Sequence, residues 1–254
     1  MNIYLCPSPE LYSLYHRPGC CVIVVDIFRA STTMVTALAH RARSIIPVAS
    51  TEEAERLGQS TDCLVAAERD TRRCAFAQLG NDPSEYSYEA VNGHDIVFTT
   101  TNGTRSITIA QQHGAEELLV GAFINLSSTL EHCAAAGRDI LVLAAGWRGQ
   151  ASMEDMLYAG ALADRAEMLG LGQAADDATR MMCDLWRAHC LSLGERVRYL
   201  SQSEHYRRLV ASGFADSVPY CLSLDIHPLV ARMQDDRLLA LNEYPAYTYL
   251  IPIS

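Results

Sequence analysis

Residues 21–42, CVIVVDIFRASTTMVTALAHRA, place an apolar run, a short polar turn and a helix-like pattern in direct succession. The apolar run up to Asp26 predicts a buried strand, and the hydroxyl-rich segment from Ser31 predicts the start of a helix. A strand followed by a helix is the repeating unit of proteins built on parallel sheets. This stretch therefore predicts an α/β fold.

The same alternation of strand and helix patterns continues along most of the chain. Further strands are predicted at 44–49, 63–67, 95–99, 118–122 and 139–145, and helices after Ser50 and through 104–114, 126–136, 153–169, 177–190 and 205–213. The apolar sequence ILVLAA at 140–145 is typical of a central strand covered on both faces. We expect a three-layer α/β/α arrangement with a mostly parallel or mixed central sheet and helical packing in the C-terminal part.

Domain boundaries are not evident in the sequence. No internal repeat, low-complexity segment or Pro/Gly/Ser-rich linker interrupts it, so one domain over 1–254 is the economical prediction. The alternative is two interlocked subdomains that meet near residue 125. For the tail EYPAYTYLIPIS at 243–254 we expect docking by packing, with an edge strand or a dimer contact as alternatives.

Composition narrows the class of protein. Nine cysteines, an odd number without a C-x-x-C pair, argue against a disulfide framework or a thiolate zinc site and favour a reducing cytoplasm. The sequence contains neither a signal-peptide pattern nor an apolar run of the roughly 18 residues that a membrane span needs. A net charge of −10 disfavours nucleic acid as a partner. A small anionic molecule remains the expected partner, with a homodimer as an open possibility.

All twenty basic residues are arginine, and the chain contains no lysine. This excludes nucleotide hydrolysis by a P-loop, whose lysine reaches the phosphates, and all Schiff-base chemistry. Any bound anion must be held by arginine, backbone amides or a metal. Arginine offers a planar fork that grips phosphate or carboxylate through two bonds.

Four polar clusters follow the predicted strands, where ligands bind in open α/β sheets. They are 26–33, with Asp26, Arg29, Ser31 and Thr32; Glu68-Arg69-Asp70; Thr99 to Arg105; and Gly146 to Gly149 followed by Glu154 and Asp155. Helix N-termini in three of them favour anions. The simpler alternatives are helix caps for the hydroxyls, a surface ion pair for the second cluster, and a helix-dipole role for the last two acids.

Together the clusters combine hard oxygen ligands with guanidinium groups. The acids are Asp26, Glu68, Glu154 and Asp155, and the arginines are Arg29, Arg69, Arg105 and Arg148. This combination favours Mg²⁺ together with a phosphate-like anion. No two histidines have metal-ligand spacing, and only His205 stands out as a possible functional histidine.

Several segments, in the same order along the chain, resemble the 2-phosphosulfolactate phosphatase family. They are VVDIFRASTTMVTAL at 24–38, Glu68-Arg69, LGNDPSEY at 79–86, TTTNGTR at 99–105, 121–125, AGWRGQASMEDMLYAG at 145–160 and HYRRLVASGFADSVPYCLSLD at 205–225. The resemblance implies a Mg²⁺-dependent hydrolase that converts 2-phosphosulfolactate to sulfolactate and phosphate on an α/β fold. Ala67, Asp82 and Ala144 depart from the residues frequent in that family.

Asp82 is the departure that bears on the substrate. A carboxylate near an anion site would repel a sulfonate or recruit a second cation. Because Pro83 follows it, Asp82 is better interpreted as a helix cap.

We assign hypothetical roles to the clusters on this basis. Asp26, Arg29, Glu68 and Asp155 are the expected catalytic residues, and Asp26, Glu68, Glu154 and Asp155 the expected Mg²⁺ ligands. Arg29, Arg105 and the Asn102-Gly103 turn would bind phosphate, while Arg69 and Arg148 would hold the acid end. The remaining substrate-binding candidates are Ser31, Thr32, Asn81, Thr101, Thr104 and Gly146.

Three alternatives stay open at this point. Either water or the Asp26 carboxylate could attack the phosphorus. The substrate could be a different phospho-hydroxyacid. The protein could also be a non-catalytic regulator that only binds anions.

Overall fold

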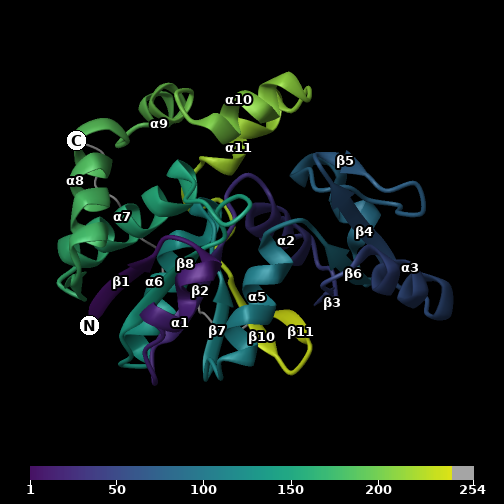
Figure 1. Cartoon of the computed structure of the whole chain (residues 1–254), viewed down its shortest axis with the longest axis horizontal. Coiled ribbons are helices and arrows are strands. Elements are labelled where there is room, and N and C mark those ends of the chain that lie inside the picture. Colours follow the sequence, from purple (N-terminus) through teal and green to yellow (C-terminus); the bar gives the residue numbers. More distant parts are fainter. Residues whose placement is uncertain (242–254) are drawn as a thin grey trace.

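The computed structural model describes residues 1–241, which form a mixed sheet flanked by helices (Figure 1). The strands are β1 (Asn2–Cys6), β2 (Cys21–Val25), β3 (Ser44–Pro47), β4 (Leu64–Arg69), β5 (Arg72–Arg73), β6 (Asp95–Thr99), β7 (Glu117–Val120), β8 (Ile140–Ala144), β9 (Gln173–Ala174), β10 (Val230–Gln234) and β11 (Arg237–Leu241). Within these residues the predicted α/β class with a mixed sheet is confirmed. The tail at 243–254 lies outside them.

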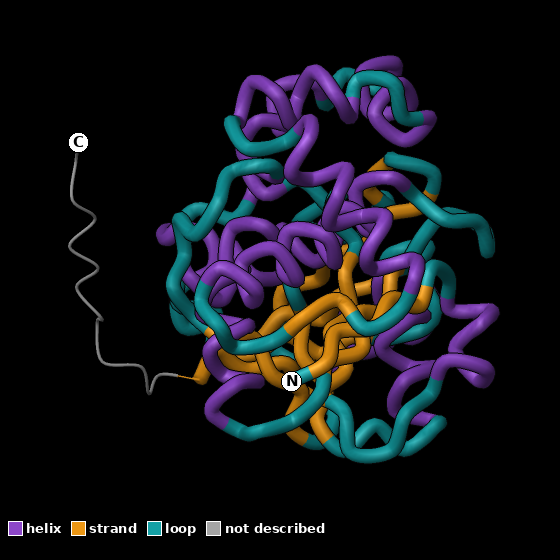
Figure 2. Tube along the Cα trace, turned by 90° about the vertical axis from the view of Figure 1, so that its left-hand side faces the viewer, coloured by secondary structure: helices purple, strands orange, loops and turns teal. Residues whose placement is uncertain are grey.

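Helices alternate with the strands and then dominate the later part of the chain. They are α1 (Tyr12–Tyr15), α2 (Ala30–Ala39), α3 (Thr51–Ser60), α4 (Tyr88–Val91), α5 (Gly103–Gln112), α6 (Leu126–Ala135), α7 (Met153–Met168), α8 (Asp177–His189), α9 (Leu193–Leu200), α10 (Glu204–Ala211) and α11 (Val218–Cys221), with short 3₁₀ turns η1 (Pro9–Leu11), η2 (Pro83–Glu85), η3 (Phe123–Asn125) and η4 (Ala215–Ser217). Figure 2 shows a helical layer above the strands.

Local chemistry explains why these segments adopt their structures. Every residue of β2 and β8 is buried, so both faces of these strands are covered, as their continuous apolar sequences predicted. Ser50 caps α3 by accepting the backbone N–H of Glu53, again as predicted. Helices α2 and α5 pack against β2 and β7, and α7 packs against β1 and β8.

The strands run in two parallel groups that point in opposite directions. Along the sheet the order is β5-β4-β6-β3-β11-β10-β7-β2-β8-β1-β9. The pairs β7/β10, β10/β11 and β11/β3 are all antiparallel, whereas β3, β6 and β4 are parallel to one another, as are β7, β2, β8, β1 and β9. Three reversals leave the β3 group antiparallel to the β7 group.

The four polar clusters follow strands of both groups, so they do not all lie at one carboxyl edge of the sheet. In a flat sheet, the carboxyl ends of β2 and β6 would point away from each other. Five strand pairings separate these two strands, and a twist of about 20–25° per pairing accumulates to roughly a quarter turn or more. The twist allows the two carboxyl edges to face a common space.

The hairpin that joins the two groups was missed at the sequence level, as were β1 and β9. β10 and β11 follow ILVLAA, which was expected to be the last strong strand, and only Asp235 and Asp236 lie between them. Asp235 adopts a φ of +55°, which tight hairpin turns require but which glycine or asparagine more often supplies. Without that signal, no strand was predicted for this segment.

Candidate active site

The loop after β2 places a carboxylate and a guanidinium at buried positions. Asp26 and Arg29 are 6% and 2% exposed. Ser31 Oγ accepts a hydrogen bond from the backbone N–H of Asp26 at 3.1 Å, and Thr32 Oγ1 donates to the carbonyl of Ile27 at 3.0 Å. Ser31 and Thr32 therefore hold the shape of this loop and do not line the cavity in front of it.

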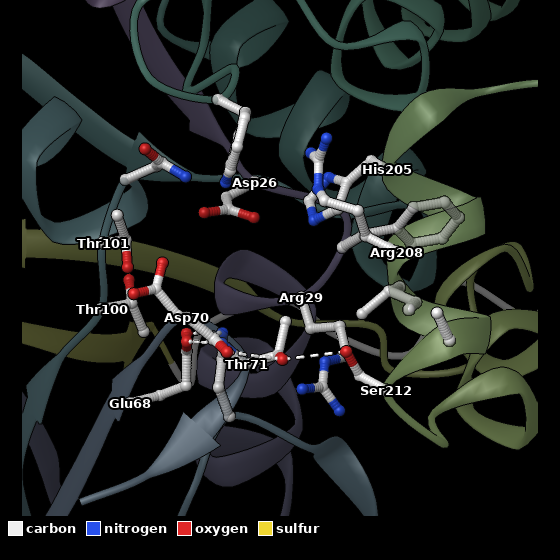
Figure 3. A pocket seen from close by; sticks show the side chains of 16 residues that line it. Asp26, Arg29, Glu68, Asp70, Thr71, Thr100, Thr101, His205, Arg208 and Ser212 are labelled. Atoms are coloured by element: carbon white, nitrogen blue, oxygen red, sulfur yellow. Dashed lines mark hydrogen bonds between the residues drawn. The ribbon is translucent and has the colours of Figure 1, made fainter.

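That cavity, about 280 Å³ in volume, is enclosed by the loop after β2, the β4–β5 hairpin, the turn before α5 and helix α10 (Figure 3). The predicted residues that line it are Asp26, Arg29, Glu68, Asn81, Thr101 and Asn102. The others are Phe28, Asp70, Thr71, Thr100, Trp147, His205, Arg208, Leu209, Ala211 and Ser212. Strand ends from both parallel groups thus meet at one site.

Two carboxylates from different strand groups line the cavity. Asp26 follows β2, and Glu68, 8% exposed, lies near the end of β4. Burial raises the pKa of Asp26 to about 6; the charge of His205 and the N–H of Ala30 oppose this rise, while the charges of Glu154 and Glu68 add to it. The cavity therefore holds negative charge that a cation would stabilise.

Glu154 and His205 form a buried pair at the cavity. His205 Nδ1 lies 2.6 Å from Glu154 Oε1, and Glu154 is fully buried. Burial would lower the pKa of His205, but the charge and hydrogen bond of Glu154 outweigh it, and the pKa is raised. The ring of Phe28 packs edge-on against the imidazole at 5.9 Å between centroids. The pair fixes the orientation of the imidazole.

Asp155, an expected catalytic residue and metal ligand, instead ties two loops together. Its Oδ1 accepts the backbone N–H of Ile27 at 2.8 Å, and its Oδ2 accepts the N–H of Gly146 at 3.0 Å and the hydroxyl of Ser152 at 2.6 Å. Burial raises its pKa well above the ordinary value. Both oxygens are engaged and Asp155 does not line the cavity, so its place is behind the Asp26 loop.

Arg29 is held by two partners. Its Nη1 lies 2.7 Å from Asp82 Oδ2, and its guanidinium stacks 3.7 Å from the ring centre of Phe214. Burial raises the pKa of Asp82, but hydrogen bonds from Ser84 and the charge of Arg29 outweigh this and lower it. Asp82 caps η2 by accepting the N–H of Ser84 at 2.9 Å, as predicted, and does not line the cavity.

Three other predicted arginines do not line the cavity, although Arg148 lies 4.4 Å from the ring centre of Trp147, which does. Arg69 donates to the carbonyl of Glu68 at 2.7 Å and to Thr99 Oγ1 at 3.0 Å. Arg105 pairs with Glu10 at 2.6 Å, and Arg148 pairs with Asp70 at 3.2 Å. Both of the latter pairs are solvent-exposed on each side. None of these three arginines contributes its side chain to the cavity lining.

Gly103 allows the N-termini of α2 and α5 to approach each other. A Cβ added to it would lie 2.8 Å from Ala30 Cβ and 3.1 Å from Asp26 Oδ2, closer than packed atoms tolerate. Thr104 Oγ1 donates to the carbonyl of Thr100 at 3.2 Å and so closes the turn. The Asn102-Gly103 turn therefore sits directly beside the Asp26 carboxylate.

Unsatisfied oxygens mark the cavity and its surroundings. Among residues 1–241, no group of three or more His, Cys, Asp or Glu side chains is assembled for a metal. Buried Glu154 Oε2, Thr100 Oγ1 and Asn81 Oδ1 nevertheless lack hydrogen-bond partners within the described chain. Buried polar atoms without partners are costly and usually have a functional reason. Asn81 and Thr100 line the cavity together with Asp26 and Glu68, whereas Glu154 does not line it.

Comparisons with known proteins identify the family of the chain. A profile of the 2-phosphosulpholactate phosphatase family matches residues 6–236. The chain belongs to this family. It is 34% identical over 223 residues to a probable 2-phosphosulfolactate phosphatase of Thermotoga maritima, covering 88% of this chain and 92% of that protein. A protein of the same description from Caldanaerobacter subterraneus is 32% identical over 217 residues, 84% and 88% of the two chains.

Family membership fixes the chemical class. The 2-phosphosulpholactate phosphatase family consists of phosphoric monoester hydrolases, and the chain is one of them. The cavity described above is lined by acidic, basic and hydroxyl side chains. No helix within residues 1–241 is both long and apolar enough to cross a membrane.

The helical wall of the site was largely missed from the sequence of this family member. His205 stood out, but Trp147, Arg208 and Ser212 were not selected, although all three lie in segments that resemble the family. Arg208 and Ser212 belong to α10 and its end, which follow no strand, so a search for polar residues after strands could not find them; Trp147 follows β8, within the Gly146 to Gly149 cluster. The cation–π spacing of Arg208 and Trp147 depends on tertiary structure alone.

Proposed function

We propose that this phosphatase hydrolyses 2-phosphosulfolactate to sulfolactate and phosphate with the help of Mg²⁺. The single observation that carries the proposal is the cavity that combines buried acids with Arg29, Arg208 and His205. Acidic side chains without cationic partners can bind a metal ion, and the cationic groups can bind the several negative charges of such a substrate. The names of the relatives supply the identity of the substrate.

The donor set fits a hard cation. Asp26 and Glu68 would hold Mg²⁺ from the two strand groups, with Glu154 Oε2 and Thr100 Oγ1 as nearby oxygens that have no other partner in the described chain. The raised pKa of Asp26 fits the same role, because a bound cation would remove the cost of its charge. When bound, the metal would supply a Lewis acid and orient water.

The residues of the chain would perform the other steps. Arg29 would hold phosphate oxygens, and backbone amides at the starts of α2 and α5 would stabilise the negative charge that spreads over them. With Nδ1 bonded to Glu154, His205 keeps Nε2 to exchange a proton with the leaving oxygen.

Phosphate release from 2-phosphosulfolactate tests this proposal directly. We expect turnover that is lost with EDTA and restored with Mg²⁺. The matched panel contains phospholactate, phosphoglycolate and phosphoglycerate. Greater efficiency with one of these would favour a different phospho-hydroxyacid, and EDTA-insensitive turnover would contradict the metal requirement. Absence of hydrolysis together with tight anion binding would favour a regulator.

A further inference from the structure

The proposed substrate carries a carboxylate and a sulfonate in addition to the ester phosphate, so it needs cationic contacts beyond those for the phosphate. Arg69 and Arg148, expected from the sequence to hold this acid end, do not line the cavity. Arg69 is bonded to Glu68 and Thr99, and the Arg148 side chain is 61% exposed. Another cationic residue must face the acid end.

Arg208 has the required position. It lines the cavity from α10, and Figure 3 shows it beside His205 on the wall that faces Asp26 and Thr101. Its guanidinium carbon lies 3.8 Å from the ring centre of Trp147, which also lines the cavity. An aromatic face favours the planar guanidinium and limits its rotation, and lysine would not reproduce this geometry.

The charge of Arg208 is only weakly neutralised. Its salt bridge is to Glu204, one helical turn earlier, at 2.7 Å, and the Glu204 side chain is 73% exposed. Solvent-exposed ion pairs of this kind have a small interaction energy. Arg29 differs, because its buried partner Asp82 already balances its charge. Arg208 is therefore the cavity arginine with the most charge left for a ligand.

We infer that Arg208 is a specificity residue whose guanidinium, oriented by Trp147, binds an acid group of the substrate other than its ester phosphate. The inference rests on the proposed function and deepens it. It replaces Arg69 and Arg148 in the acid-end role.

The experiment compares Arg208→Gln, Arg208→Lys and the control Arg207→Gln, which removes the same charge from an exposed neighbour on α10. Each protein is assayed at saturating Mg²⁺ with 2-phosphosulfolactate and with three simpler esters. 2-Phospholactate lacks the sulfonate, and 2-phosphopropane-1-sulfonate lacks the carboxylate. Isopropyl phosphate lacks both acid groups. Isothermal titration calorimetry measures sulfolactate binding without turnover.

We expect Arg208→Gln to raise KM for 2-phosphosulfolactate by about 10- to 100-fold, the effect of losing one charge-assisted contact, with a smaller change in kcat. The KM for isopropyl phosphate should change by less than about 3-fold in Arg208→Gln, because this ester lacks the acid groups that Arg208 binds. The acid whose removal from the substrate abolishes the effect is the partner of Arg208. The KM of Arg208→Lys for 2-phosphosulfolactate should lie between those of the wild type and Arg208→Gln. The KM of Arg207→Gln should equal that of the wild type.

The inference would be overturned if Arg208→Gln raised KM equally for all four esters, or raised it for none of them. Failure of the wild-type protein to bind sulfolactate would overturn it too, whatever the activity. The proposed function fails in a different way, through absence of phosphate release from 2-phosphosulfolactate by the wild-type enzyme.

Discussion

The two walls of the cavity differ in origin and in charge. The wall built from strand ends presents Asp26, Glu68 and Thr100, all 8% exposed or less, whereas the wall built from α10 presents His205 and Arg208 at partly exposed positions. Backbone hydrogen bonds and buried side chains fix the first wall. On the roles proposed above, the acidic wall would hold the metal, while the helical wall would supply the proton through His205 and bind an acid group of the substrate through Arg208.

The largest expected effect tests the acidic wall. Asp26→Asn should lower kcat for phosphate release by about 10³-fold, because it removes a carboxylate that is proposed to hold Mg²⁺. Steady-state kinetics with circular dichroism to verify folding is the measurement. An activity within a few-fold of the wild type would end the assignment of chemistry to this wall.

The second prediction concerns the buried ion pair that supports the acidic wall. Asp82→Ala should destabilise the protein by about 3–5 kcal/mol, because it leaves the Arg29 guanidinium, 2% exposed, without its partner. Asp70→Ala breaks the exposed pair with Arg148 and should cost less than about 1 kcal/mol. Urea unfolding of both variants compares them. Equal costs would mean that burial does not distinguish these pairs.

The pH dependence of stability gives a third test. The pKa of Asp26 rises from 3.8 to about 6 on folding, so the native state binds the extra proton between these values and stability falls as pH increases through that window. In metal-free buffer, Asp26→Asn should therefore be more stable than wild type at pH 7, by about 2–3 kcal/mol. The gain should shrink towards pH 4. Denaturant unfolding at several pH values measures it, and a constant difference would contradict the shift.

The smallest effect tests the contact between α2 and α5. Gly103→Ala should lower the free energy of unfolding by about 1–3 kcal/mol, because the added methyl group would clash with Ala30 and Asp26. Gly194→Ala in α9 is the control, since its added methyl meets no atom within 4 Å and should be neutral or slightly stabilising. Thermal unfolding resolves the two. A neutral Gly103→Ala would show that the acidic wall is less rigid than inferred.

The acidic wall was largely predictable from sequence, and the helical wall was not. Asp26, Glu68 and Thr101 follow or end apolar strands, so local pattern placed them at a sheet edge. The direction of that edge was not predictable, because the antiparallel β10–β11 hairpin reverses the strand groups from near the end of the described chain. Asp155 was misplaced for a related reason, since a first-turn acid faces either a ligand or a neighbouring loop, and periodicity does not distinguish them.

The two tryptophans of the chain occupy contrasting surroundings. Trp186 is 4% exposed and stacks on Phe123 in the core, while Trp147 lies under Arg208 at the cavity. Replacing Trp186 with phenylalanine would leave a single indole at the site, and its fluorescence would respond to anything that moves Arg208. On the proposed role of Arg208, Trp147 would serve as an intrinsic optical reporter of ligand binding, and Trp186 as a separate reporter of core packing.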